Sequence, residues 1–98
     1  MVEVRWTPQA LDDLESIADF IAKDSLYYAR LFVIDILEAV DRLAKFPKSG
    51  RVVPELKNQI IREIILGNYR VVYQLRKQIV EILTVYHGAK LFGSFEAN

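Results

Sequence analysis

Three apolar segments of strand length in the second half of the chain most constrain how it can fold. They are rich in β-branched residues and run from Ile60 to Leu66, from Tyr69 to Leu75 and from Ile79 to His87. Gly67-Asn68 separates the first two, and Arg76-Lys77-Gln78 separates the last two. Connections this short join neighbouring strands as hairpins, so we predict an antiparallel meander of three strands.

The first half of the chain has the pattern of one short strand followed by two helices. Apolar and charged residues alternate up to Trp6, and Thr7-Pro8 then supplies a helix cap followed by proline at the first helical position. Apolar residues recur every three or four positions in both helices, the second of which runs from its cap Ser25 to Ala44 and is stopped by Phe46-Pro47. The predicted order is β-α-α-β-β-β, an α+β fold with a helical hairpin packed on one face of a small antiparallel sheet.

Composition limits the chain to a single domain that covers residues 1–98. Hydrophobic residues make up 52% of the chain and charged residues 27%, which is typical of a globular protein with one modest core. Cysteine is absent, which excludes disulfides and cysteine-based zinc sites or nucleophiles. Every apolar stretch is interrupted by a charge well before the ~20 residues that a membrane span requires. We therefore expect a cytoplasmic protein without a membrane span.

The net charge of zero conceals two halves of opposite sign. Residues 1–44 carry 4 cations and 9 anions, whereas residues 45–98 carry 9 cations and 4 anions. A basic second half suits an anionic partner such as RNA, DNA or an acidic peptide. The alternative is that the two halves attract each other within one fold.

The predicted sheet is apolar on both faces. Alternate positions of the middle strand form one face with Tyr69, Val71, Tyr73 and Leu75 and the other face with Arg70, Val72 and Gln74. In the last strand, Val80 and Ile82 oppose Leu83 and Val85. A sheet that is covered by helices on one side only is normally polar on the other. We therefore hypothesise that a partner chain covers the second face, with self-association or the carboxy-terminal tail as the alternatives.

Four segments of the chain form a recognisable set. A helical hairpin that opens WTPQALDDLESIADFI is followed by GRVVPEL, IREIILGNYRVVYQL and VEILTVYHGAK. These segments give the chain a resemblance to the RelE/ParE superfamily of toxins, often called plasmid-stabilisation proteins. The resemblance covers nearly the whole chain and is most specific at the run Tyr-Arg-Val-Val-Tyr that begins at Tyr69 and at His87-Gly88. The resemblance implies a toxin of a type II toxin–antitoxin module, neutralised in a hetero-oligomer by an antitoxin whose disordered tail folds upon it.

The superfamily has two activities, and the resemblance extends to both. RelE-like members cleave messenger RNA on the ribosome, whereas ParE-like members inhibit DNA gyrase without known nuclease activity. Metal-independent RNA cleavage needs groups that move protons and cations that stabilise the phosphorane. By resemblance to the nucleases, the catalytic candidates are Arg70, His87 and Glu55. The candidates for binding the substrate or target are Arg51, Arg62, Tyr86 and Lys90, and Tyr86 is also an alternative to His87 in catalysis.

Each candidate also has a structural interpretation. Glu55 follows Pro54 and fits a solvated loop charge, while Arg70 lies among tyrosine and valine, where a charge is costly unless it is paired. His87 is of the residue type that most often transfers protons in catalysis, but a lone histidine at a strand end is usually structural. The tyrosines at strand spacing fit core positions as well as base stacking, and Glu63 fits an ion pair with Arg62 or with a neighbouring strand.

Two features weigh against a nuclease. RNA-cleaving members are typically strongly basic because affinity for RNA follows the number of phosphates neutralised, whereas this chain is neutral. They also tend to carry lysine or arginine in the strand before the Tyr-Arg pair, where this chain has Glu63. The ending His87-Gly88 with Lys90 is closer to the ParE-like branch.

We therefore favour a gyrase inhibitor slightly, with a ribosome-associated messenger-RNA endonuclease as the alternative. A degenerate member that only binds antitoxin is the third possibility. The sequence predicts no cofactor and no metal, since it has neither a recognisable set of ligands nor a glycine-rich phosphate loop.

Overall fold

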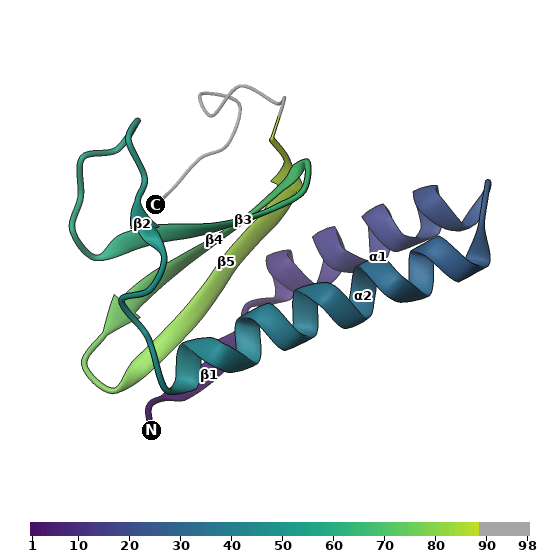
Figure 1. Cartoon of the computed structure of the whole chain (residues 1–98). Helices are drawn as coiled ribbons and strands as arrows, with labels where there is room; N and C mark the ends of the chain where they lie inside the picture. Colours follow the sequence, from purple (N-terminus) through teal and green to yellow (C-terminus); the bar gives the residue numbers. More distant parts are fainter. Residues whose placement is uncertain (89–98) are drawn as a thin grey trace.

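The computed structural model describes residues 1–88, which form two helices and a five-stranded sheet (Figure 1). In chain order the elements are β1 (Glu3–Trp6), α1 (Pro8–Ala22), α2 (Leu26–Asp41), the 3-10 helix η1 (Arg42–Ala44), β2 (Arg51–Val52), β3 (Ile61–Leu66), β4 (Tyr69–Arg76) and β5 (Ile79–His87). The α+β class and the predicted order are confirmed, with the two-residue strand β2 as an addition. Its segment is rich in turn-forming residues, which is why the sequence pattern did not predict a strand.

Both helices begin at the predicted caps. The Thr7 side-chain oxygen accepts a hydrogen bond from the Ala10 backbone N–H at 3.2 Å, with Pro8 at the first helical position. The Ser25 side-chain oxygen accepts from the Tyr28 backbone N–H at 3.1 Å. Each cap satisfies a backbone donor that has no partner inside the helix. The caps therefore fix where the hairpin of helices starts and turns.

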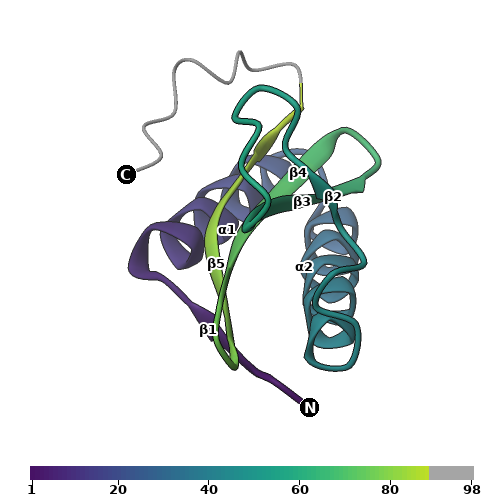
Figure 2. The same cartoon turned by 90° about the vertical axis from the view of Figure 1, so that its left-hand side faces the viewer.

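The sheet has the strand order β1-β5-β4-β3-β2. The β3–β4 and β4–β5 pairs are antiparallel, which confirms the predicted meander, whereas β1 runs parallel to β5 from Glu3 opposite Ile79 to Trp6 opposite Ile82. Figure 2 shows β1 beside β5 at one edge of the twisted sheet. At the other edge, β2 pairs only with Arg62 and Glu63. Within residues 1–88, the outer edge of β3 beyond Glu63 therefore has no strand partner.

The main core lies between the helices and one face of the sheet. Its buried residues are Ala10, Leu14, Ile36, Val40, Leu43, Val71, Tyr73, Val80, Ile82 and Val85. The alternation predicted for the middle strand is confirmed, because Val71 and Tyr73 are buried in this core and Leu75 packs against it. Val72 lies on the opposite face.

The alternation predicted for the last strand is wrong at Val85. Val72 lies opposite Thr84 and Tyr73 lies opposite Ile82, so Leu83 is an extra residue in β5. Such a bulge shifts the alternation by one position. Val85 therefore joins Val80 and Ile82 in the helix-side core, while Leu83 packs on the other face.

The second face of the sheet is partly covered by the protein's own loop. Val72 and Tyr86 are buried there against Val53, with Leu56 packed on the cluster. Figure 1 draws the loop between β2 and β3 on the side of the sheet away from the helices. The hypothesis that this apolar face needs a partner chain is therefore wrong at Val72, which the loop covers together with Tyr86. The carboxy-terminal tail, the other predicted cover, lies outside the described residues.

A buried tyrosine fixes the loop that leads into β2. The Tyr73 hydroxyl accepts a hydrogen bond from the Gly50 backbone N–H at 2.9 Å and donates one to the Pro47 carbonyl, also at 2.9 Å. Burial raises the pKa of this phenol. A Cβ atom on Gly50 would lie 2.6 Å from the Glu63 carbonyl oxygen, so only glycine allows the loop to lie so close to β3. This close contact positions Arg51, the next residue.

Replacing Tyr73 with phenylalanine should destabilise the fold by about 1–3 kcal/mol, because it leaves the Gly50 N–H and the Pro47 carbonyl without a partner. Urea unfolding followed by circular dichroism measures this loss. Tyr28→Phe is the matched control, since the Tyr28 side chain is exposed. Equal midpoints for the two variants would contradict the role assigned to the buried hydroxyl.

Candidate functional site

The centre of the candidate site is a buried carboxylate held between two arginines. The Glu63 side chain is fully buried, and its Oε2 lies 2.6 Å from Arg51 Nε and 3.0 Å from Arg70 Nη2. Its Oε1 lies 2.9 Å from Arg70 Nε, a close ion pair whose N–H does not point along the line of a hydrogen bond. A buried charge is tolerated only when it is paired in this way.

Strand register explains why these three side chains meet. Arg51 lies opposite Glu63 in the β2–β3 pair, and Glu63 lies opposite Val72 in the β3–β4 pair. Arg70 is two positions from Val72, so it lies on the same face and diagonal to Glu63. Three strands thus contribute one charged group each to the same spot.

The outer side of Arg70 is also occupied. Its Nη1 lies 3.2 Å from Glu55 Oε2 and 3.0 Å from the Tyr86 hydroxyl, and its Nη2 lies 3.5 Å from Glu55 Oε1. Each of the three guanidinium nitrogens therefore lies against an oxygen of the same protein. Only 11% of the Arg70 side chain is exposed. The structural interpretation of Arg70, an internal ion pair, matches this geometry.

These contacts shift three ionisation equilibria. Burial works against the charged form of Arg70, but the hydrogen bonds to Glu55 and Glu63 outweigh it and raise the pKa of Arg70. The hydrogen bond from Arg70 lowers the pKa of Glu55. Burial raises the pKa of Tyr86, although the nearby Arg70 cation acts against this shift. Arg70 and Glu55 are therefore fully charged, and Tyr86 is a neutral phenol, at neutral pH.

His87 lies on the other side of the sheet from the Arg70 guanidinium. It is opposite Tyr69 in the β4–β5 pair, whereas Tyr86 is opposite Arg70. The rings of Tyr69 and His87 meet edge to face at 5.3 Å, and Tyr69 also contacts Phe32 of α2 at 4.9 Å. Because successive residues of a strand face opposite sides, His87 belongs to the helix side.

Arg62 is also separate from the Arg70 cluster. Its Nη1 donates to the Gly50 carbonyl at 2.9 Å and to the Lys48 carbonyl at 3.3 Å. The predicted alternative of an Arg62–Glu63 pair is wrong, because neighbouring positions of β3 face opposite sides and Glu63 binds Arg51 and Arg70. The other option predicted for Glu63, an ion pair with a neighbouring strand, is correct, because Arg51 lies on β2 and Arg70 on β4. Lys90, predicted to bind the target, lies outside the described residues.

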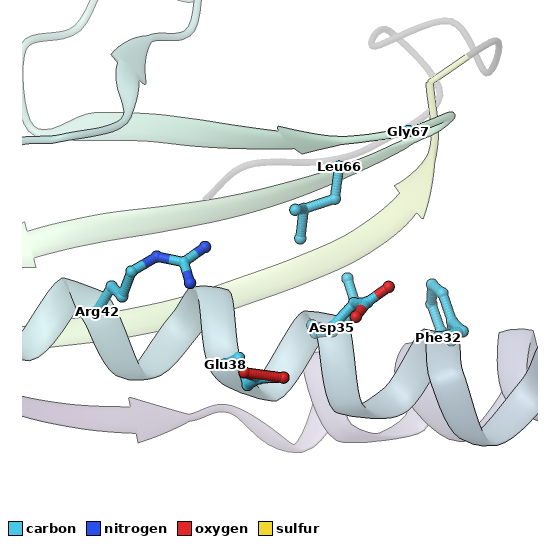
Figure 3. A pocket seen from close by; sticks show the side chains of 7 residues that line it. Phe32, Asp35, Glu38, Arg42, Leu66 and Gly67 are labelled. Carbon is cyan, nitrogen blue, oxygen red and sulfur yellow. The ribbon is translucent and has the colours of Figure 1, made fainter.

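Four of the predicted residues line one hollow at the end of the sheet. This hollow has a volume of about 520 Å³ and is lined by Arg51, Glu55, Ile65, Gly67, Asn68, Tyr69, Arg70, His87 and Gly88. A second hollow of about 310 Å³ lies between α2 and the β3–β4 hairpin. In Figure 3, Leu66 points from the sheet toward α2, whose Phe32, Asp35 and Glu38 line the opposite side together with Arg42 of η1. Among residues 1–88, none of the predicted site residues lines this second hollow.

The prediction of an ion pair between Glu63 and a neighbouring strand left open which residues Glu63 binds. Its place as the buried anchor of both Arg51 and Arg70 is what the sequence analysis missed. A single acidic residue within the apolar run of β3 was the available signal, because such a charge must find a cationic partner. Residues 1–88 hold no group of three or more histidine, aspartate or glutamate side chains arranged to bind a metal ion. No helix in the same range is long and apolar enough to cross a membrane.

Comparison with protein families decides the identity. The model for the ParE toxin of the type II toxin–antitoxin system parDE matches residues 4–92. The chain belongs to this toxin family. The resemblance to the RelE/ParE superfamily is thereby confirmed, and the protein is the toxin of a type II toxin–antitoxin system.

Two relatives agree with this assignment. The toxin is 30% identical over 91 residues to toxin RelE2 of Caulobacter vibrioides, covering 93% of this chain and 100% of the relative. It is 41% identical over 86 residues to a protein of Sinorhizobium fredii that carries the toxin name Y4kP, covering 86% and 85% of the two chains.

Two solved structures share the fold of this toxin. One is the chromosomal ParDE system from P. aeruginosa, with a TM-score of 0.74, 23% identity and coverage of 89% of this chain and 96% of that one. The other is the RelBE2 complex from Mycobacterium tuberculosis, with a TM-score of 0.63, 22% identity and coverage of 88% and 96%. Both likenesses extend over nearly the full described fold.

Replacing Glu63 of the toxin with glutamine should cost about 3–5 kcal/mol of unfolding free energy, because it leaves the shielded Arg70 cation without its buried counter-charge. Chemical denaturation of the purified protein measures this change. The matched control is Glu81→Gln, whose exposed pair with Arg76 contributes roughly 0–1 kcal/mol.

A double variant separates the loss of a charge from the loss of packing. Glu63→Leu with Arg70→Met removes the whole buried pair and should recover most of the stability lost in Glu63→Gln. If Glu63→Gln is no more destabilising than Glu81→Gln, the anchoring role of Glu63 is wrong.

Proposed function

We propose that this toxin arrests growth by binding DNA gyrase, without cleaving RNA. The observation that supports the proposal is the engagement of Arg70, whose three guanidinium nitrogens all lie against Glu55, Glu63 or Tyr86. In this arrangement the donors of Arg70 are already engaged, and the buried Glu63 stays beside it even when the more exposed Glu55 moves away, so Arg70 is poorly suited to stabilise the charge that develops on a scissile phosphate. Gyrase is a cytoplasmic target, so the proposal places the toxin in the cytoplasm.

The groups that would move protons are also poorly arranged for RNA cleavage. Cleavage needs a base and an acid aligned with the cation on one phosphate. His87 faces the helix side with Tyr69, away from the Arg70 guanidinium. Tyr86 does contact Arg70, but burial raises the pKa of its phenol and makes it a weaker proton donor at neutral pH.

Charge argues in the same direction. Arg51 and Arg70 carry two positive charges, and Glu55 and Glu63 carry two negative charges within the same cluster. The cluster is therefore neutral, as is the whole chain. Affinity for a polyanion depends on the number of phosphates that cations neutralise. A neutral surface should therefore bind ribosomal or messenger RNA weakly.

Ribosome-associated cleavage of messenger RNA remains the alternative function. It is favoured by one observation, namely that Arg51, Glu55, Arg70 and His87 line the same hollow of about 520 Å³. A substrate that displaced Glu55 would reach Arg70 from this hollow. A nuclease needs Tyr86 or His87 to transfer protons, whereas a binding inhibitor does not, and this difference allows a direct test.

Expression of the toxin in a bacterial host should trigger a DNA-damage response while messenger RNA stays intact, and the purified toxin should inhibit supercoiling by gyrase. Tyr86→Phe and His87→Ala should retain both effects, because neither side chain transfers a proton in a binding inhibitor. Mapping of RNA 5′ ends together with a damage reporter measures the outcome. Codon-positioned cuts that disappear in Arg70→Ala would establish the nuclease instead. Absence of any growth defect would support a member that only binds antitoxin.

We also propose that a cognate antitoxin neutralises the toxin by placing an amphipathic helix on the outer side of the helical hairpin. An apolar groove of about 400 Å³ lies there between α1 and α2. Its lining residues are Ala18, Asp19, Ala22, Leu26, Ala29, Arg30, Val33 and Ile34. Small alanines on both helices leave space for the side chains of a third helix, which is a common mode of peptide recognition. The related structures are described as a ParDE system and a RelBE2 complex, which supports a partner of this kind.

The open edge of β3 offers the antitoxin a second contact. Beyond Glu63, the strand has no partner within the described residues, and the hollow of Figure 3 lies beside its last residue, Leu66. An extended segment added at this edge would complete the backbone hydrogen bonds of β3. A helix in the groove and a strand at the edge together would wrap the toxin.

Ile34→Glu should weaken the complex with the antitoxin at least about tenfold, because it places a charge in the apolar groove. The matched control is Leu11→Glu, since Ile34 is 49% exposed and Leu11 is 51% exposed, and only Ile34 lines the groove. Co-purification with the neighbouring antitoxin and titration calorimetry measure the effect. Equal affinities for the two variants would rule out this groove as the docking site.

A further inference from the structure

The two carboxylates that bind Arg70 differ in how firmly they are held. The Glu63 side chain is fully buried and is shared with Arg51, whereas the Glu55 side chain is 41% exposed and contacts Arg70 at 3.2 Å and 3.5 Å. An ion pair that includes an exposed partner is weak, because water competes for the charges. Glu63 therefore stays paired with Arg70, whereas the ion pair between Glu55 and Arg70 can break.

Glu55 can leave without unfolding its loop. Its neighbour Val53 is fully buried against Val72 and Tyr86, and Leu56 packs on the same cluster. These two anchors hold the loop on the sheet while the Glu55 side chain points to the hollow at the end of the sheet. A change of side-chain rotamer is then enough to uncover the Nη1 and Nη2 edge of Arg70.

We propose that this edge of Arg70, together with Arg51, is a binding site for an acidic side chain of a polypeptide partner, and that Glu55 occupies it as an internal competitor. Glu55 already contacts both terminal nitrogens, which is the fork geometry in which arginine binds a carboxylate. An aspartate or glutamate of a partner would take the same position. The inference does not depend on whether the target is gyrase or RNA.

A carboxylate of a polypeptide fits this site better than a phosphate of a nucleic acid. Glu63 remains beside Arg70 after Glu55 has left, so the exposed edge carries too little positive charge to attract a polyanion. The hollow is also lined by the half-exposed apolar side chain of Ile65 and by Tyr69. These groups offer contacts to the aliphatic part of an acidic side chain and to the backbone around it.

The test compares the binding of a fluorescent six-residue peptide, which carries one glutamate among glycines and a capped carboxy terminus, to the full-length toxin and to its Glu55→Ala variant by fluorescence anisotropy. Removing a weak internal competitor should tighten peptide binding by roughly fivefold, and added salt should reduce the gain. Glu38→Ala is the matched control, because Glu38 is an exposed glutamate of α2 that lines the other hollow. Its affinity should equal that of the unmodified toxin.

Two results would overturn the inference. One is an unchanged affinity of Glu55→Ala for the peptide, with the fold verified by an unaltered unfolding midpoint. The other is an equal or larger gain for a six-nucleotide single-stranded RNA, which would identify a phosphate site instead. Neither measurement reads gyrase inhibition, so failure here is distinct from failure of the proposed function.

Discussion

The buried carboxylate of Glu63 is the interaction on which the second face of the sheet depends. β2 is only two residues long, and its pairing with β3 is supported by the ion pair between Arg51 and Glu63 and by the hydrogen bond from Gly50 to Tyr73. On the other side, Glu63 orients Arg70 of β4. A carboxylate without these arginines could not be buried, and the arginines without it would repel each other. The edge strand and the candidate site are therefore products of the same pairing.

The same pairing changes what Arg70 can do chemically. Seen in the sequence, an arginine followed by two valines and a tyrosine resembles the phosphate-binding arginine of an RNA-cleaving toxin. In the folded chain its charge is balanced by Glu63 and Glu55, and its remaining donor reaches Tyr86. The hydrogen bonds to Glu55 and Glu63 favour its charged form against the effect of burial, and they direct its donors inward. This arrangement suits a surface that recognises a protein more than one that stabilises a phosphorane.

The elements that depend on local sequence were predictable, and those that depend on register were not. Thr7 and Ser25 capped the helices as expected, and the short turns at Gly67 and Lys77 gave the meander. The parallel pairing of β1 with β5 joins distant segments, and the bulge at Leu83 depends on which residue of β4 lies opposite. For the site, the separation of His87 from Arg70 followed from strand alternation and could have been inferred. The partners of Glu63 could not, because they required the pairing of three strands.

The parallel pairing of β1 with β5 has a consequence for the order in which the protein is made. Residues near Glu3 leave the ribosome first, but their strand partners near Ile79 leave almost last. Contacts so far apart in sequence form late, because the entropy cost of closing a long loop must be met before the contacts stabilise the chain. During synthesis β1 therefore has no strand partner at first, and the sheet is completed only after nearly all of the described chain has left the ribosome. An immature chain in this state lacks a finished sheet, and the backbone groups of β1 that pair with β5 stay exposed until β5 has emerged.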